Sequence, residues 1–397
     1  MKHIGTVVRG IKTPIISKDM NLKEVVVNSL IDASNEGNFT FNDKDVVAIT
    51  ESVVARCEHN YVNMDDICYD IKKKYKTNHI GLVLPTPVSR NRFSLILKGI
   101  ARAMDKITML LSYPDDEVGN CLFDPNLIYE NKLNPFSDVL NEKEYRFYFK
   151  DATHIFTGVD YIKYFRDVCE SENCEIEYVF TTNPLEILNY TKDVLVCNIH
   201  NRKRTKEILK EHGALTIYGT DDILTESVNG SGFNPKYGLL GSNMATDDTL
   251  KLFPKDGEKL VYEIQEMLKE KTNKNIEVMV YGDGAFKDPV GKIWELADPV
   301  VSPAYTDGLK GTPNEIKLKY VSDNTLSNLR GDALNEAMKE EIKKKESNLV
   351  GQNKSLGTTP RRIVDLVGSL CDLTSGSGDK GTPVILIQGY FDNYAND

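Results

Sequence analysis

The chain has 397 residues, a formal net charge of −10 and 40% hydrophobic residues. This length and composition predict a packed protein of about two or three domains. The acidic balance argues against a nucleic-acid partner, which would need clustered positive charge, and the absence of an apolar run of about 18 residues argues against a membrane span.

Cysteine and histidine patterns argue against the common zinc and redox sites. The seven cysteines are scattered, and the closest pair, Cys169 and Cys174, has neither the zinc-ribbon nor the redox spacing. The six histidines form no paired ligand motif. Because the N-terminus has no signal-peptide core, we expect a cytoplasmic protein with reduced thiols.

The N-terminal part predicts two strands and a possible anion site. We expect a first strand over His3–Val8 and a second over Asp45–Thr50, which runs directly into a helix opening with Glu51 and Ser52. A hydroxyl and free N–H groups at a helix N-terminus favour an anion or a nucleotide, and Arg56 lies about one turn further on. The alternative is a capped helix with a surface arginine.

Acidic residues follow a later strand. We expect strands over Ile80–Leu84 and Ile107–Leu111, and the second exits into Asp115, Asp116 and Glu117. Adjacent carboxylates repel one another unless a cation or solvent neutralises them. The stretch therefore predicts either a metal site or a solvated acidic turn.

Residues 121–236 have a different character from the rest of the chain. Strand-like segments over Ile176–Phe180, Val194–Ile199 and Leu215–Tyr218 alternate with a helix over Asn201–His212. This alternation of strands and helix predicts a small α/β layer. We therefore divide the chain into a core of residues 1–120 and 237–397 and an inserted subdomain of residues 121–236.

The segment after this insert contains the strongest candidate site residue. A helix over about Gly257–Glu270 precedes a buried strand, Ile276–Val280, and Asp283 then stands between two glycines. A carboxylate on backbone that bends closely around a ligand suits a hard cation and the phosphates that it carries. The alternative is a tight turn in which Asp283 bonds its own backbone.

The C-terminal part predicts an extended loop and then helices. We expect the loop over residues 288–303, a charged surface helix over Gly331–Asn348, a helix from Thr359 to about Leu373, and a last strand over Val384–Tyr390. The glycines of residues 376–381 fit a GxGxxG pattern, but they follow a helix, whereas a dinucleotide fingerprint follows a strand. No Walker A loop is present.

Four stretches together resemble the coenzyme F(420)-0 gamma-glutamyl ligase family. They are Thr13–Ile16 with its following helix, residues 45–56, residues 253–286, and the C-terminal helix, glycine loop and strand. The resemblance implies an α+β fold with a mixed sheet, here with an inserted small α/β subdomain, and an intertwined homodimer. It also implies GTP or ATP as co-substrate and Mg²⁺ or Mn²⁺ as the metal ion. The implied intermediate is an acyl phosphate, through which a small acid is joined to an amino acid.

The resemblance also assigns roles to individual residues. Those implied to contact the nucleotide are Pro14, Ile15, Glu51, Ser52, Arg56 and Asn243. Those implied to bind metal are Asp283 with Asp115 or Asp116, because the insert has split the family motif between an acid before it and an amide, Asn243, after it. Asp283, Arg56 and Arg361 are the candidate catalytic residues.

Two departures from the family pattern leave the function open. Gly284 stands where the family has a threonine, and Arg361 and Arg362 align with an Asp-Glu pair. Arginines at a helix N-terminus suit a phosphate directly. We therefore expect a nucleotide- and metal-dependent amide ligase that adds L-glutamate or a similar amino acid to a small acid. The alternative is a non-catalytic nucleotide- or metabolite-binding protein of ligase ancestry.

Overall fold

The computed structural model describes most of the chain, which divides into two compact units. The described residues are 3–84, 90–115, 121–150, 152–154, 158–198, 201–282, 285–287, 294–296, 302–355, 362–375 and 378–396, without the side chains of 90–92, 285–287 and 294–296. Unit 1 comprises Met1–Val54, Asp256–Gly282 and Val301–Asp397, and unit 2 comprises Ala55–Lys255 and Asp283–Val300.

Unit 1 brings the two ends of the chain together. Its elements are β1 (Val7–Ile11), α1 (Leu22–Gly37), β2 (Val46–Thr50), α9 (Gly257–Thr272), β12 (Glu277–Tyr281), β15 (Ala304–Tyr305), η3 (Asp307–Leu309), α10 (Leu318–Tyr320), η4 (Val321–Thr325), α11 (Gly331–Lys343), η5 (Asn353–Ser355), α12 (Ile363–Ser375), η6 (Gly378–Lys380) and β16 (Val384–Gln388). Helix α2 (Glu51–Cys57) begins in unit 1 and continues into unit 2.

A mixed five-stranded sheet is the centre of unit 1. Its strand order is β1-β16-β2-β12-β15, so neighbours in the sheet come from opposite ends of the sequence. Strands β2 and β12 are parallel, while β16 runs antiparallel to both β1 and β2, and β15 runs antiparallel to β12. The predicted α+β fold with a mixed sheet is confirmed.

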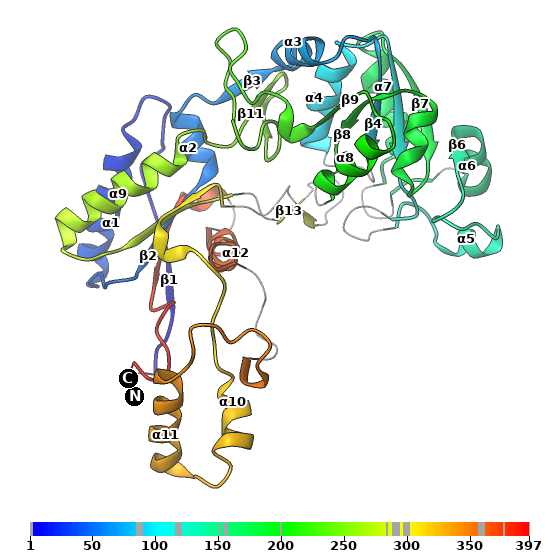
Figure 1. The fold of residues 1–397 in the computed structure, drawn as a ribbon. Helices are drawn as coiled ribbons and strands as arrows, with labels where there is room; N and C mark the ends of the chain where they lie inside the picture. Colours follow the sequence, from blue (N-terminus) through cyan, green and yellow to red (C-terminus); the bar gives the residue numbers. More distant parts are fainter. Residues whose placement is uncertain are drawn as a thin grey trace. The chain divides into compact units, whose positions relative to one another are not determined.

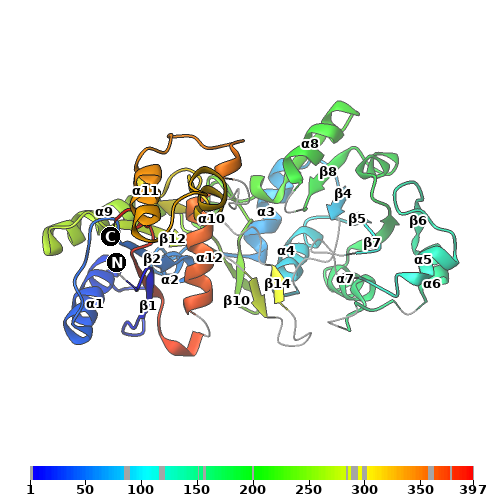
Figure 2. The same ribbon diagram turned by 90° about the horizontal axis from the view of Figure 1, so that it is seen from below.

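Helices cover both faces of this sheet (Figure 1). Alternate residues of β2 and β12, among them Val46, Ala48 and Met279, pack with Val364 and Val367 of α12. The residues between them point to the opposite face because side chains alternate along a strand. There α9 contacts β12 and β15, and α1 packs against α9. Figure 2 shows α12 running beside β1, β2 and β12.

A small helical projection follows β15 in unit 1. Helices α10 and α11 form an antiparallel pair (Figure 1), and Val321, Met338 and Ile342 form its apolar centre. Residues near the C-terminus, Tyr394 and Ala395, pack against this cluster. The predicted surface helix is confirmed over Gly331–Lys343, where most side chains are exposed.

Unit 2 contains the middle of the chain and a short hairpin. Its elements are β3 (Tyr61–Asn63), α3 (Met64–Lys74), β4 (His79–Leu84), α4 (Arg90–Ala101), β5 (Lys106–Leu111), α5 (Asn126–Glu130), β6 (Leu140–Asn141), α6 (Glu142–Phe149), α7 (Tyr161–Glu170), β7 (Glu175–Phe180), η1 (Pro184–Asn189), β8 (Asp193–Val196), α8 (Arg202–Glu211), β9 (Thr216–Gly219), η2 (Thr220–Asp222), β10 (Asn243–Thr246), β11 (Thr249–Lys251), β13 (Ala285–Lys287) and β14 (Trp294–Leu296).

The main sheet of unit 2 has the order β6-β7-β5-β4-β8-β9, and all its strands except β6 are parallel. Strands β4 and β5 lie in the middle of this sheet, between β7 and β8. The predicted boundary between residues 120 and 121 therefore divides one continuous sheet. The α/β layer begins earlier than predicted because the hydrogen-bonding partners of β4 and β5 come from residues 175–196.

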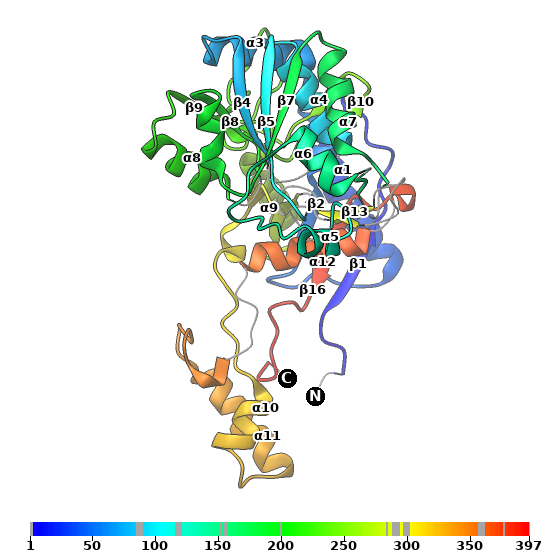
Figure 3. The ribbon, with the colours of Figure 1, turned by 90° about the vertical axis from the view of Figure 1, so that its right-hand side faces the viewer.

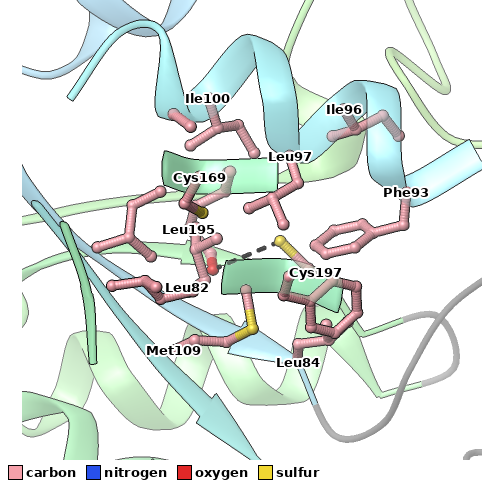
Figure 4. Packing of buried hydrophobic residues seen from close by; sticks show 14 of the residues in the cluster. Leu82, Leu84, Phe93, Ile96, Leu97, Ile100, Met109, Cys169, Leu195 and Cys197 are labelled. Atoms are coloured by element: carbon pink, nitrogen blue, oxygen red, sulfur yellow. Dashed lines mark hydrogen bonds between the residues drawn. The ribbon is translucent and has the colours of Figure 1, made fainter. Parts of the chain in front are cut away.

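Helices lie on both faces of this parallel sheet (Figure 3). On one face, α3, α4 and α7 pack on a large core, in which Leu82, Met109 and Leu195 meet Phe93 and Leu97 (Figure 4). On the other face, a smaller cluster joins the strands to η1 and α8. Parallel strands buried on both faces are nearly continuous apolar runs, which is why they could be predicted.

Several element boundaries differ from the predictions. Strand β1 begins at Val7 rather than His3, because its hydrogen bonds are set by β16, whose Gln388 pairs with Val7. Asn21 has the residue type and position of an N-cap for α1, but its side chain makes no capping hydrogen bond. The region predicted as an extended loop, residues 288–303, contains strand β14, which pairs with β13 just before it. Among the described helices, none combines the length and hydropathy needed to cross a membrane.

Candidate functional site

The carboxyl ends of β2 and β12 form the candidate site in unit 1. The two strands are parallel neighbours, and their register pairs Thr50 with Tyr281 and Ile49 with Val280. Both strands therefore end at the same edge of the sheet. Glu51 and Ser52 open α2 directly after Thr50, and the chain continues from Tyr281 through Gly282 toward Asp283. Asp283 itself lies outside the described residues.

The segment after β1 reaches the same edge. Ile11, the last residue of β1, pairs with Val384, which in turn pairs with Ile49 of β2. The backbone N–H of Thr13 donates to the carbonyl of Gly381 at 3.2 Å. Pro14 and Ile15 come next and are exposed, with 93% of Ile15 accessible to solvent. The structure thus brings Thr13, Pro14 and Ile15 to the edge where β2 and β12 end.

The hydroxyl of Tyr281 links three elements at this edge. Hydrogen bonds join it to the side chains of Thr50 and Ser375, and burial raises the pKa of Tyr281 to about 12. Ser375, at the end of α12, donates its hydroxyl to the carbonyl of Asp372 at 2.9 Å. The tyrosine is therefore neutral at physiological pH and fixes the ends of β2, β12 and α12 relative to one another.

The loop before β16 extends the same cluster toward β1. The Thr382 hydroxyl donates to the Ser375 carbonyl at 3.4 Å. A Cβ atom added to Gly10 of β1 would come within 3.1 Å of the Thr382 side chain. A larger residue at position 10 would therefore have to displace the Thr382 side chain by a few tenths of an ångström. The network Thr50–Tyr281–Ser375–Thr382 was not predicted, since its members meet only through the pairing of the strands.

The predicted nucleotide residues at the start of α2 differ in exposure. Glu51 is buried, with 3% of its surface accessible, whereas Ser52 and Arg56 are exposed. Ser52 and Arg56 are four residues apart and so lie on the same side of the helix. However, α2 has only 7 residues. The ligand contacts of this segment would therefore come from the side chains of Glu51, Ser52 and Arg56 rather than from a long helix dipole.

The other predicted site residues belong to unit 2 or lie outside the described residues. Asp115 follows β5 and forms an isolated bridge with Cys121, and Asn243 begins β10, where it pairs with Lys251. Asp116 and Arg361 are outside the described residues, as is Asp283. Whether Asp115 or Asp116 joins Asp283 at one metal therefore stays a prediction.

Arg362, the neighbour of Arg361, makes a local contact instead of presenting a free cation. Its guanidinium donates two hydrogen bonds of 2.9 Å to the carboxylate of Asp365, three residues further along the chain. This bidentate geometry is the strong form of an arginine–carboxylate pair. A phosphate bound by Arg362 would have to compete with Asp365.

The polar atoms at the edge of the unit 1 sheet are oxygens, the type of ligand that hard cations prefer. They are the Glu51 carboxylate and the hydroxyls of Thr50 and Ser52, and oxygen ligands of this type suit Mg²⁺ and Mn²⁺. No group of three or more His, Cys, Asp or Glu side chains able to hold a metal occurs within the ranges that the structure describes. Metal binding at this edge therefore stays a prediction.

These features define an α+β protein that gathers polar side chains where two parallel strands of a mixed sheet end. Such positions commonly bind small molecules. A sequence model of the F420-0:Gamma-glutamyl ligase family matches residues 10–389. Because the match spans nearly the whole chain, the protein belongs to this family of ligases, as the resemblance predicted. A comparison with curated proteins gave no match.

Proposed function

We propose that the protein is a nucleotide- and metal-dependent amide ligase that adds L-glutamate or a similar amino acid to a small carboxylic acid. Membership of the ligase family supports the class of reaction. The observation that carries the proposal is the register of β2 and β12, which pairs Thr50 with Tyr281. It brings Glu51, Ser52 and the backbone leading to Asp283 to one edge of the sheet.

The proposed reaction has two steps. A carboxylate oxygen of the acid attacks the terminal phosphorus of the nucleotide, and the nucleoside diphosphate leaves. The amine of the amino acid then attacks the acyl carbon of the resulting acyl phosphate, loses a proton and expels inorganic phosphate. Catalysis of such a transfer depends mostly on positioning and on neutralising charge.

The residues at the edge have roles that suit these steps. The exposed side chains of Pro14 and Ile15 offer an apolar surface to a nucleotide, which is GTP or ATP in this proposal. Arg56, which is exposed one turn after Ser52, can place its guanidinium on the transferred group. Because Tyr281 is buried and neutral, it acts through the positions of β2 and β12 rather than by transferring a proton.

A divalent ion completes the proposed chemistry. Asp283 supplies a hard oxygen donor of the kind that Mg²⁺ or Mn²⁺ prefers, with Asp115 or Asp116 as a further carboxylate. When bound, the ion would neutralise charge on the phosphate oxygens. The proposal also includes a homodimer, which light scattering of the purified protein would test.

Phosphate release tests the proposal directly. The wild-type protein, given GTP or ATP with Mn²⁺, glutamate and candidate acids, should release phosphate only when an acid is present. Asp283→Asn should abolish this release, while Asp323→Asn, which changes an exposed aspartate elsewhere in unit 1, should not. Unchanged release in Asp283→Asn would remove Asp283 from the site. Tight nucleotide binding without release by the wild type would favour the non-catalytic alternative.

A further inference from the structure

The parallel sheet of unit 2 changes its direction of winding between β4 and β8. From β4 the chain adds β5 and then β7 on one side, and it then crosses to add β8 and β9 on the other side. Accordingly, α4 and α7 pack on one face while α8 packs on the other (Figure 3). In sheets of this kind, ligands bind at the carboxyl ends of the strands where the winding changes.

A buried amide oxygen at this point of the sheet has no partner among the residues that the structure describes. Asn198 follows β8 by two residues and is 4% exposed. Its Nδ2 donates to Thr205 Oγ1 at 3.1 Å, and Thr205 Oγ1 donates its single hydrogen to the carbonyl of Asn201 at 3.0 Å. The amide orientation is therefore fixed, because Thr205 can only accept from Asn198. For the remaining atom, Asn198 Oδ1, the described residues supply no hydrogen-bond partner.

The next strand ends in a second buried polar atom of the same kind. Val196 of β8 pairs with Gly219 of β9, so Thr220 leaves the sheet at the same edge as Asn198. Thr220 is 5% exposed, and no side chain or backbone group in the described part of the chain bonds its Oγ1. Buried polar atoms are nearly always paired with protein, water or ligand. Two such atoms on neighbouring strands indicate a place where a ligand with hydroxyl or N–H groups can bind.

Helix α8 begins beside these two atoms with an unusual charge pattern. Its first turn carries Arg202, Lys203 and Arg204 and no acidic residue, and Asn201 gives it no side-chain cap. Cations are unfavourable at the positive end of a helix unless an anion is bound there. The Arg202 guanidinium also donates to the backbone carbonyl of Asn198 at 3.0 Å, which ties the first turn to the buried amide.

Carboxylates neutralise only part of this charge. Arg202 forms an ion pair with Asp221 at 2.8 Å, and Lys206 forms one with Asp222 at 2.7 Å. Within the described ranges, Lys203 and Arg204 have no ion pair and are exposed. A negatively charged group at the N-terminus of α8 would therefore meet two cations that the protein leaves unneutralised.

We propose that the edge formed by Asn198, Thr220 and the first turn of α8 is a second small-molecule site, which takes a phosphorylated ligand that also carries hydroxyl groups. The phosphate lies at the N-terminus of α8, near Lys203 and Arg204. Hydroxyl groups of the ligand donate to Asn198 Oδ1 and exchange hydrogen bonds with Thr220. The site lies within unit 2 and does not depend on the ligase reaction proposed for unit 1.

Calorimetry of the full-length protein with ribose 5-phosphate tests this site, with inorganic phosphate and ribose as separate probes. Ribose 5-phosphate should bind more tightly than either probe alone. Arg204→Glu should weaken its binding by about tenfold or more, whereas Lys210→Glu makes the same charge change in the last turn of α8 and should have little effect. Absence of binding by ribose 5-phosphate, or equal losses in both variants, would overturn the proposal.

A second variant separates binding from folding. Thr220→Val keeps the shape of the side chain and removes a hydroxyl for which the described ranges offer no partner. The midpoint of urea unfolding should therefore not fall. Binding of ribose 5-phosphate should weaken, while binding of inorganic phosphate should not change. If the two probes respond equally to Thr220→Val, the assignment of the hydroxyl contact to this residue is wrong.

Discussion

Thr50 and Tyr281 are register partners in the parallel pair β2–β12, and a hydrogen bond joins their side chains. The two residues are far apart in the sequence, yet each is the last of its strand. Ser375 of α12 bonds the same tyrosine hydroxyl. The side chain of Tyr281 thus adds a contact at the ends of two strands whose backbones are already paired in register.

Tyr281→Phe should lower the free energy of unfolding by about 1–2 kcal/mol. The substitution removes the phenol hydroxyl, so the hydroxyl groups of Thr50 and Ser375 lose their interaction with it. Urea unfolding followed by circular dichroism measures this change. Tyr305→Phe in the neighbouring strand β15 is the matched control, since the structure describes no hydrogen bond of the Tyr305 hydroxyl. Equal effects of the two substitutions would show that the Tyr281 hydroxyl has no special role.

The sequence predicted strands β2, β12 and β16 of this sheet but not their pairing. Val46–Thr50 and Glu277–Tyr281 are buried apolar runs, so their conformation follows from local pattern. Their parallel pairing depends on packing between distant segments, which periodicity does not encode. For this reason Glu51 and Asp283 could each be predicted as a site residue from its own sequence context. The contact of Tyr281 with Thr50 and Ser375 could not be predicted.

The division of the chain was harder to predict for the same physical reason. The sequences of β4 and β5 predict buried strands but do not show to which unit the strands belong. A strand of a parallel sheet that is covered on both faces has the same apolar run in any domain. Only the pairing of β5 with β7, and of β4 with β8, assigns them to the α/β unit. The position of the Asn198 amide oxygen could likewise not be predicted from the sequence, because the orientation of the amide depends on the hydrogen bond from its Nδ2 to Thr205.

Glu172 should make unit 2 sensitive to acid. Its carboxylate accepts two hydrogen bonds from Arg102, at 2.8 and 2.9 Å, and this interaction lowers the pKa of Glu172 below its ordinary value of 4.5. A lowered pKa in the folded state means that the stabilisation is present above pH 4.5 and is lost as the pH falls through the folded value. Glu172→Gln should therefore cost about 1–2 kcal/mol at neutral pH and progressively less below pH 4.5.

Urea unfolding of wild type and Glu172→Gln at neutral pH and at several values below pH 4.5 checks this expectation. Asp65→Asn is the control, because Asp65 bonds the same arginine at 2.8 Å but has 77% of its side chain exposed. Exposed ion pairs contribute little, so this variant should lose less than about 0.5 kcal/mol. A pH-independent cost of Glu172→Gln would mean that packing, not charge, explains the loss.

Gly308→Ala should destabilise unit 1. The N–H of Gly308 donates to Glu277 Oε2 at 3.1 Å, and a Cβ atom at this position would overlap with the buried Glu277 carboxylate. Thr306 bonds the same oxygen, so the carboxylate cannot move without losing a partner. We expect a loss of about 1–3 kcal/mol, measured by thermal or urea unfolding. Gly5→Ala, where a Cβ would meet no atom within 4 Å, should change stability by less than about 0.5 kcal/mol.

Tyr281→Phe and Ser375→Ala should be non-additive. Each substitution alone breaks the hydrogen bond between the two side chains, so the double variant loses that bond only once. The double variant should therefore be more stable than the sum of the single losses predicts, by about 0.5–1.5 kcal/mol. The cycle Tyr305→Phe with Ser375→Ala provides the control, because the structure describes no bond between those residues, and it should be additive within about 0.5 kcal/mol. Additivity in the first cycle would show that Tyr281 and Ser375 of α12 are not energetically coupled. The interaction of the Tyr281 hydroxyl would then be with Thr50 only.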